Sequence, residues 1–292
     1  MTPALHAKHY ADDLQQVTRP LLMNDQVADD THLMRIHAPE IAGRTRPGQF
    51  VMVRMADVNA PLIGRALAVF DVHEGPDGRP ATIDLIYLKK GALTTPLAQS
   101  PNGTDVTVWG PLGNGFADRP CDRLIMAAGG IGQTPMLMAG RDALARGWAR
   151  HVELIYGARR GGLLAGVEQF EAAGFDLTLC TDDGSRGLQQ RVPDVVRDRL
   201  DQLGDQSPDE IVRVITCGPE IMMEKVSEAC MQHSVDCQVS METPMACGIG
   251  ICFSCVAKVW QEDGDWDYKR TCVEGPIFDG GKICWEKGGS AG

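Results

Sequence analysis

The sequence has little positive charge and lacks any long apolar run. Its 292 residues include 28 Lys and Arg against 39 Asp and Glu, which gives a formal net charge of -11. A nucleic-acid partner needs a basic face that displaces phosphate counterions, so this composition argues against one. No stretch approaches the roughly 20 apolar residues that a membrane helix requires. We therefore expect neither a nucleic-acid partner nor a membrane-spanning segment.

The N-terminal residues also lack the features of a secretory signal. The stretch MTPALHAKHYADD has neither a basic region nor an apolar segment after it, so we expect a cytoplasmic protein. Ten cysteines are present, and four of them lie between Cys247 and Cys272. The others occur singly, so the pattern indicates metal ligation and not a disulfide scaffold.

The hydrophobic pattern divides the chain into four parts. Residues 1–16 have no pattern and are expected to form an N-terminal extension. Short β-like runs separated by turn residues fill 17–118 and predict an antiparallel β-barrel. Four strand–helix units in 119–236 predict an α/β domain, a parallel sheet with helices on both faces and ligands at the carboxyl ends of its strands. Residues 237–292 hold a last strand and the cysteine cluster.

The cysteine cluster is the most specific motif. Cys247, Cys252, Cys255 and Cys272 have the spacing C-x4-C-x2-C-x16-C, and the first three follow the plant-type [2Fe-2S] pattern. Two glycines lie in the four-residue loop, where a backbone that wraps closely around a cluster needs conformational freedom. The alternatives are a zinc knuckle or unrelated buried thiols. Structural zinc sites normally pair two C-x2-4-C knuckles and only one is present, so we predict that these residues hold a [2Fe-2S] cluster.

A glycine turn joins a strand to a helix in LIMAAGGIGQTPM. Backbone N-H groups and the start of a helix at such a turn receive a pyrophosphate, which makes Gly129, Gly130, Gly132 and Pro135 candidate nucleotide-binding residues. The run does not follow G-x-G-x-x-G, and close helix packing also uses glycine. The motif by itself is compatible with both explanations.

Polar residues after the neighbouring strands leave the choice of nucleotide open. Arg159 and Arg160 stand where an Arg accommodates the 2′-phosphate of NADP, although a solvated basic turn has the same composition. Residues 181–184 (Thr-Asp-Asp-Gly) follow the third strand at the same edge of the sheet. They can belong to the nucleotide site, or they can form an ordinary Asp-Gly turn. Cys217 ends the fourth strand, where a ligand is expected. These residues do not decide between NAD and NADP.

A third motif, Gly64 to Ala68, lies within a predicted barrel strand. Arg65 can meet a flavin pyrophosphate as a fork of donors, and the small residues around it let a ring system approach. Together with GPLGNGF, GGIGQTP, CGPEIMME and CGIGICFSC, this motif makes the chain resemble one family from about residue 17 to 284. It is similar to the electron-transfer subunits of the NAD-linked, class 1B dihydroorotate dehydrogenases, in the ferredoxin reductase superfamily.

The resemblance implies an FAD-binding barrel, an NAD-binding α/β domain and a small C-terminal [2Fe-2S] region. In the family an Arg-Pro-x-Ser run, an Ile-Tyr-Arg run and a Gly-Thr pair bind the flavin. The matching residues here are Arg65, Ala66, Leu67, Ala68, Ile86, Tyr87, Leu88, Leu93 and Thr94. The four cysteines match the family's cluster ligands.

This sequence departs from the family's flavin motifs at four positions. Ala66 replaces Pro, Ala68 replaces a hydroxyl residue, Leu88 replaces Arg and Leu93 replaces Gly. Backbone contacts survive such changes. The lost Ser hydroxyl and Arg charge are expected to weaken FAD binding or to shift the flavin potential.

The resemblance also implies a function and a partner. An FMN-containing dihydroorotate dehydrogenase catalytic subunit, in a hetero-oligomer expected to be a heterotetramer, would send electrons through [2Fe-2S] and FAD to NAD+ in pyrimidine biosynthesis. The rival hypothesis is a reductase component that feeds an oxygenase or hydrogenase from NAD(P)H. Oxygenase reductases usually carry a whole ferredoxin domain, which the short segment after Cys247 does not provide. A colourless zinc scaffold is the non-redox alternative.

Apolar residues around the cluster motif predict a docking face for that partner. Met245, Ile249, Ile251 and Phe253 are interspersed with the first three cysteines. They can form the dry centre of an interface, or they can only shield the cluster from water. The sequence leaves both roles open.

Overall fold

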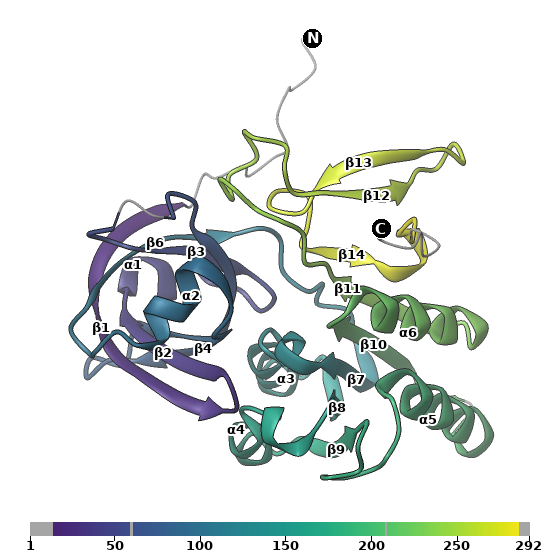
Figure 1. The fold of residues 1–292 in the computed structure, drawn as a ribbon. Helices are drawn as coiled ribbons and strands as arrows, with labels where there is room; N and C mark the ends of the chain where they lie inside the picture. Colours follow the sequence, from purple (N-terminus) through teal and green to yellow (C-terminus); the bar gives the residue numbers. More distant parts are fainter. Residues whose placement is uncertain (1–13, 59–60, 208, 286–292) are drawn as a thin grey trace.

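The computed structural model describes residues 14–58, 61–207 and 209–285, so nearly all of the predicted extension at 1–16 lies outside the described residues. Figure 1 shows a barrel beside a sheet that is layered with helices, and a smaller cysteine-bearing region next to both. Within the described ranges, no helix combines the length and the apolar character needed to cross a bilayer.

Six antiparallel strands form a closed barrel in the order β1-β2-β5-β4-β3-β6. They are β1 (Gln15–Ala28), β2 (Thr31–His37), β3 (Phe50–Met55), β4 (Arg65–Glu74), β5 (Pro80–Leu88) and β6 (Asp105–Leu112), with two short helices, α1 (Pro39–Ala42) and α2 (Gly91–Ala98). Alternate side chains, including Ile36, Val53 and Leu85, fill the interior. β1 pairs with both β2 and β6 and so closes the barrel. The predicted antiparallel barrel is confirmed.

The second domain is built on a six-stranded sheet in the order β14-β11-β10-β7-β8-β9. Its parallel strands are β7 (Cys121–Gly129), β8 (Ala149–Ala158), β9 (Asp176–Thr181), β10 (Val212–Cys217) and β11 (Asp236–Ser240), and β14 (Ile277–Asp279) runs antiparallel to β11. The helices are α3 (Met136–Ala145), α4 (Val167–Ala172), α5 (Val192–Gln206) and α6 (Glu220–Gln232), with short turns η1 (Gly130–Gln133), η2 (Gly161–Leu163) and η3 (Gly280–Lys282).

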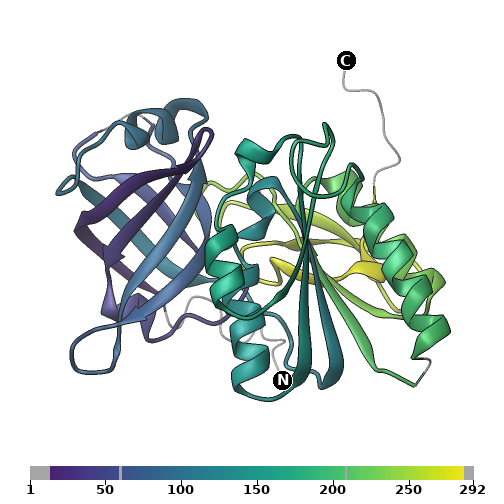
Figure 2. The same cartoon turned by 90° about the horizontal axis from the view of Figure 1, so that it is seen from below.

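Helices cover both faces of this sheet, as predicted (Figure 2). Leu124 and Leu154 pack with residues of α3 and α4, whereas Ile125 and Ile155 pack with residues of α5 and α6. Neighbouring residues of one strand therefore enter opposite layers, which explains why these strands are apolar throughout.

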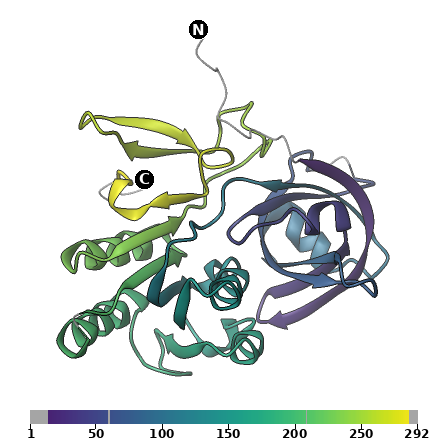
Figure 3. The same cartoon turned by 180° about the vertical axis from the view of Figure 1, so that it is seen from behind.

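The cysteine-bearing region contacts both domains. Its strands β12 (Val256–Trp260) and β13 (Trp266–Arg270) pair as a hairpin that stands beyond β14 (Figures 1 and 3). Trp109 Nε1, on the barrel, donates a hydrogen bond to the carbonyl of Cys247 at 3.0 Å. A Cβ at Gly248 would lie only 2.6 Å from Met52 Cγ. The segment from 237 onward also supplies β14 and most of β11 to the sheet, so the boundary at 236/237 falls inside a strand and our domain division stays a proposal.

Candidate functional site: an interdomain cavity beside a cysteine cluster

A cavity of about 1240 Å³ lies between the barrel and the sheet. Small-molecule pockets usually measure about 300–1,000 Å³, so this one has room for a large ligand such as a dinucleotide. Its walls come from β4 and β5 of the barrel and from the carboxyl ends of β7, β8 and β10. The cavity thus lies where an open α/β sheet is expected to bind ligands.

The glycine turn forms part of this wall, and its glycines are needed for different reasons. Gly129, Gly130 and Gly132 line the cavity, whereas Pro135 caps α3 and does not. A Cβ at Gly132 would lie 2.2 Å from the carbonyl oxygen of Cys217, so β10 leaves no room for a side chain. Gly130 has φ of +54° and open space where a Cβ would be. The turn therefore offers exposed backbone to a phosphate, as a helix-start anion site requires.

The residues after β8 and β9 divide between the cavity and other contacts. Arg159 and Asp182 line the cavity. Arg160 instead forms an ion pair with Asp29 of the barrel, with 3.1 Å between Nη1 and Oδ2. Asp183 accepts hydrogen bonds from the backbone and hydroxyl of Ser185. Of the residues predicted in these two turns, Arg159 and Asp182 are therefore the two charged side chains that a ligand in the cavity can reach.

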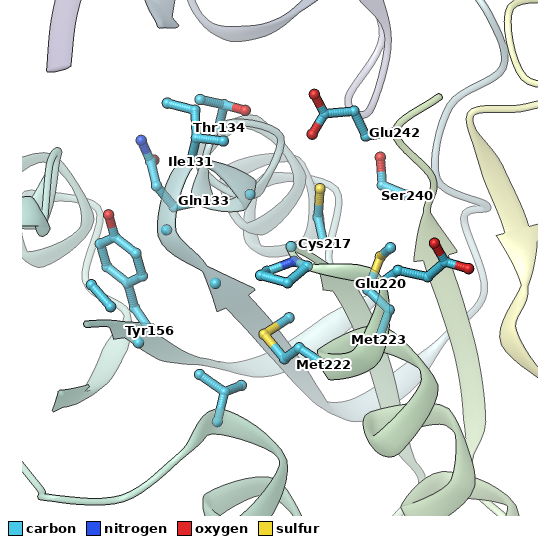
Figure 4. A pocket seen from close by; sticks show the side chains of 18 of the residues that line it. Ile131, Gln133, Thr134, Tyr156, Cys217, Glu220, Met222, Met223, Ser240 and Glu242 are labelled. Carbon is cyan, nitrogen blue, oxygen red and sulfur yellow. The ribbon is translucent and has the colours of Figure 1, made fainter. Parts of the chain in front are cut away.

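Cys217 lines the cavity together with two residues that the sequence analysis missed. Figure 4 shows Cys217, Ser240 and Glu242 next to one another. Burial raises the pKa of Cys217 to about 12, so the side chain remains a neutral thiol. Ser240 ends β11, and its position beside β10 depends on strand order, which no local motif reveals.

Gln133 is a second residue that the sequence analysis missed. It lies in the glycine turn and lines the cavity, yet it is fully buried. Neither amide atom has a hydrogen-bond partner within the described residues. A long amide side chain in the glycine-rich GGIGQTP turn was the available signal.

The structure brings six of the nine predicted flavin residues to the barrel side of the cavity. These are Arg65, Ala66, Leu67, Ala68, Ile86 and Leu88. The small side chains at 66 and 68 leave room for a flat ring system, and the exposed Arg65 can donate to an attached pyrophosphate.

The other three predicted flavin residues do not line the cavity. Tyr87 points into the barrel, where its hydroxyl donates to Asn24 Oδ1 at 2.7 Å. Because side chains alternate along β5, Tyr87 faces away from Ile86 and Leu88. Leu93 and Thr94 are buried in α2, and the Thr94 hydroxyl accepts a hydrogen bond from Lys90 N at 2.9 Å.

The four predicted metal ligands lie close together as two pairs. The sulfurs of Cys255 and Cys272 are 3.1 Å apart and buried. Hydrogen bonds, chiefly from Ser254 and also involving Cys247, lower the pKa of exposed Cys252. A lowered thiol pKa favours the thiolate, the form that binds metal.

The paired arrangement distinguishes two kinds of metal centre. Across the described ranges, no three His, Cys, Asp or Glu side chains converge as ligands of a single ion. Structural zinc needs four ligands around one point, whereas a two-iron cluster takes two protein ligands on each iron. The pairing of Cys255 with Cys272 and of Cys252 with Cys247 therefore fits the two irons of a [2Fe-2S] cluster.

Comparisons with known proteins agree with this geometry. Residues 242–284 match the family described as the iron-sulfur cluster binding domain of dihydroorotate dehydrogenase B. The chain is 34% identical over 261 residues to the electron transfer subunit of dihydroorotate dehydrogenase B (NAD(+)) from Desulforamulus reducens, covering 89% of this chain and 95% of the relative. The subunit of the same name from Geobacillus kaustophilus is 32% identical, with 88% and 94% covered.

Solved structures show the same architecture. The NADH-dependent reduced ferredoxin-NADP oxidoreductase superposes with a TM-score of 0.76 and 26% identity, covering 91% of this chain and 90% of that one. The ferredoxin reductase of carbazole 1,9a-dioxygenase gives a TM-score of 0.61 at 14% identity, covering 76% and 67% of the two chains. The second likeness supports the fold alone.

Proposed function

The chain belongs to the family of dihydroorotate dehydrogenase B electron transfer subunits, and we propose that it passes electrons from an FMN-containing catalytic subunit to NAD+ in pyrimidine biosynthesis. The observation that carries this proposal is the similarity to relatives of that name over nearly the whole chain, at 34% identity to one of them. In this chain, four cysteines lie as two pairs beside an interdomain cavity. The described segment after Cys247 forms a hairpin and one sheet strand instead of a ferredoxin domain. The name of the relatives supports this function over the rival oxygenase or hydrogenase reductase.

Three cofactors are required, and the residues that fit each of them are distinct. Cys247, Cys252, Cys255 and Cys272 hold the [2Fe-2S] cluster, the β4 and β5 wall binds FAD, and the glycine turn binds NAD. When bound, the flavin exchanges single electrons with the cluster and a hydride with the nicotinamide. The chain's own contribution is to bind and orient these groups around one cavity.

The names of the relatives support NAD over NADP, because both are described as NAD(+) enzymes. Among the polar residues of the cavity, Asp182 directly follows β9, and its carboxylate would repel a 2′-phosphate placed beside it. Arg159 remains available for the pyrophosphate or the adenine ring. The neutral Cys217 thiol adds no charge beside the reacting groups.

The exposure of the apolar residues around the cysteines supports the predicted docking face and limits it to two of the four predicted residues. Ile251 and Phe253 are 70% and 63% exposed beside the exposed Cys252. Met245 and Ile249 are only partly exposed, and they pack against a group of buried apolar side chains that includes Met52. Met245 and Ile249 therefore shield the site, whereas Ile251 and Phe253 keep most of their surface exposed to a partner. We place the catalytic subunit there, in a cytoplasmic hetero-oligomer that we expect to be a heterotetramer.

Reconstitution tests the proposal. The isolated chain, loaded with its cofactors, should oxidise NADH with an artificial acceptor but should not turn over dihydroorotate. Adding an FMN-containing catalytic subunit should establish dihydroorotate-dependent NAD+ reduction. Turnover of dihydroorotate by the chain alone, or no coupling to any such subunit, would overturn it.

A surface variant tests the docking face separately. Ile251→Asp places a charge in the proposed dry centre and should weaken assembly and coupled turnover by at least tenfold. Ile211→Asp is the matched control, because Ile211 is 62% exposed just before β10, at the amino end of that strand, and does not line the cavity. If Ile251→Asp couples as well as the control does, this docking face is wrong.

A further inference from the structure

Arg270 ends β13 two residues before the fourth cluster cysteine, and its side chain makes contacts in three directions. Nε and Nη2 donate to the two carboxylate oxygens of Glu274 at 3.2 and 2.8 Å. Nη1 donates to the carbonyl of Gly250 at 3.1 Å. The guanidinium carbon lies 5.0 Å from the centre of the Phe253 ring. The side chain is only 15% exposed, so these contacts hold it in place.

The three partners lie on three different segments of the cluster site. Gly250 lies between the first and second cysteines, Phe253 lies between the second and third, and Glu274 follows the fourth. One side chain therefore connects the segment that carries three ligands to the segment that carries the last. Few residues can do this, because it requires a planar fork with donors on two edges and a face that stacks on a ring.

The backbone of this loop needs such support. Phe253 has φ of +56° and Gly250 has φ of +76°. A left-handed conformation is unfavourable for a non-glycine residue, so Phe253 adopts it only where other contacts hold it. The Arg270 guanidinium over the Phe253 ring is one such contact, and the hydrogen bond to Gly250 fixes the other half of the loop.

We propose that Arg270 is a positioning residue that holds the cysteine loop in the shape that receives the [2Fe-2S] cluster. The inference rests on the proposed function, because it takes the four cysteines as iron ligands. Contacts around metal ligands commonly change metal affinity by about 10–100-fold when they are removed. The geometry assigns that role here to the fork and face of the guanidinium, and not to its charge alone.

Two substitutions separate geometry from charge. Arg270→Lys keeps the positive charge but loses the fork, and Arg270→Met loses both. Both variants should lose iron to a chelator roughly tenfold faster than the parent, and both should change the electron paramagnetic resonance signature of the reduced cluster. Lys269→Met is the matched control, since it removes a neighbouring charge from the opposite face of β13, where Lys269 pairs with Asp267.

The outcomes distinguish this proposal from a charge effect and from failure of the proposed function. Arg270→Lys behaving as the parent while Arg270→Met loses iron would assign the effect to charge and overturn the proposal. Unchanged iron retention in both variants would also overturn it. A parent protein with zinc and no iron would defeat the proposed function itself. NADH oxidation through the flavin and thermal unfolding of the iron-free protein should stay close to the parent, and a large loss of both in Arg270→Met would show a general folding role instead.

Discussion

The cysteine loop (residues 247–255) and the glycine turn (residues 129–135) both present a site for a ligand, but with different parts of the chain. The cysteine loop uses side-chain sulfurs, whose number and spacing are written in the sequence. The glycine turn uses backbone groups and empty space, which depend on what lies opposite. A site made of reactive side chains is therefore easier to predict than a site made of shape.

The glycines of the two regions show this dependence directly. A Cβ at Gly132 would strike the backbone of β10, whereas one at Gly248 would strike the side chain of Met52 in the barrel. Both neighbours are distant in sequence. Glycine is required at each position because of a contact that only the folded chain creates.

The largest expected effect is at the cysteine loop. Cys252→Ser removes one predicted iron ligand and should reduce cluster content from about two irons per chain to a small fraction, because each iron depends on its thiolates. The α/β domain should remain folded and should still bind NADH. Iron analysis and visible absorbance measure the result. Cys284→Ser is the control because Cys284 lies outside the four-cysteine set, and a normal cluster spectrum in Cys252→Ser would show that the ligand set is wrong.

NADH binding at the glycine turn should be sensitive to the addition of a single methyl group. Gly132→Ala introduces a Cβ 2.2 Å from the Cys217 carbonyl oxygen and should weaken NADH binding at least tenfold, with a loss of stability of about 1–3 kcal/mol. Titration with NADH and thermal unfolding measure both effects.

Gly174→Ala is the matched control for this prediction. Gly174 has φ of +78° and nothing within 4 Å of an added Cβ, so only backbone strain of about 1–2 kcal/mol is expected, with NADH affinity unchanged. Equal NADH affinities in the two variants would show that the approach of β10 does not matter to the site.

A smaller effect is expected on the barrel side of the cavity. Ala68→Ser restores a hydroxyl at a position that faces the cavity and should tighten FAD binding about fivefold or shift the flavin potential, as one added hydrogen bond would. Flavin titration and a redox titration measure the two quantities. Unchanged values for both would remove our explanation of the departure at this position.

The smallest effect concerns the contact between the barrel and the cysteine loop. Trp109→Phe removes the 3.0 Å hydrogen bond to the Cys247 carbonyl but keeps an aromatic ring, so a cost of about 1 kcal/mol is expected. Iron should be lost to a chelator several times faster than from the parent. Loss at the parent's rate would mean that this bond does not support the cluster.

The wall of the cavity formed by β4 and β5 shows which part of the flavin site the sequence could not predict. The match to the family placed nine residues at the flavin, but alternation along β5 allows Ile86 and Leu88 to face the cavity only if Tyr87 faces away. Ser240 and Glu242 were missed because β11 reaches the cavity through its pairing with β10, across a sheet whose strand order does not follow the chain.

The sequence by itself determined the elements and predicted four cysteines as metal ligands. Hydrophobic periodicity and cysteine spacing are local properties, so they predicted the barrel strands, the strand–helix units and the four cysteines without reference to distant residues. The tertiary structure decided which of those elements meet. Only the folded chain brings β4 and β5 to the ends of β7 and β10, lays the cysteine loop against Trp109, and sets Arg270 over Phe253, because such contacts depend on strand order and packing between residues far apart in sequence.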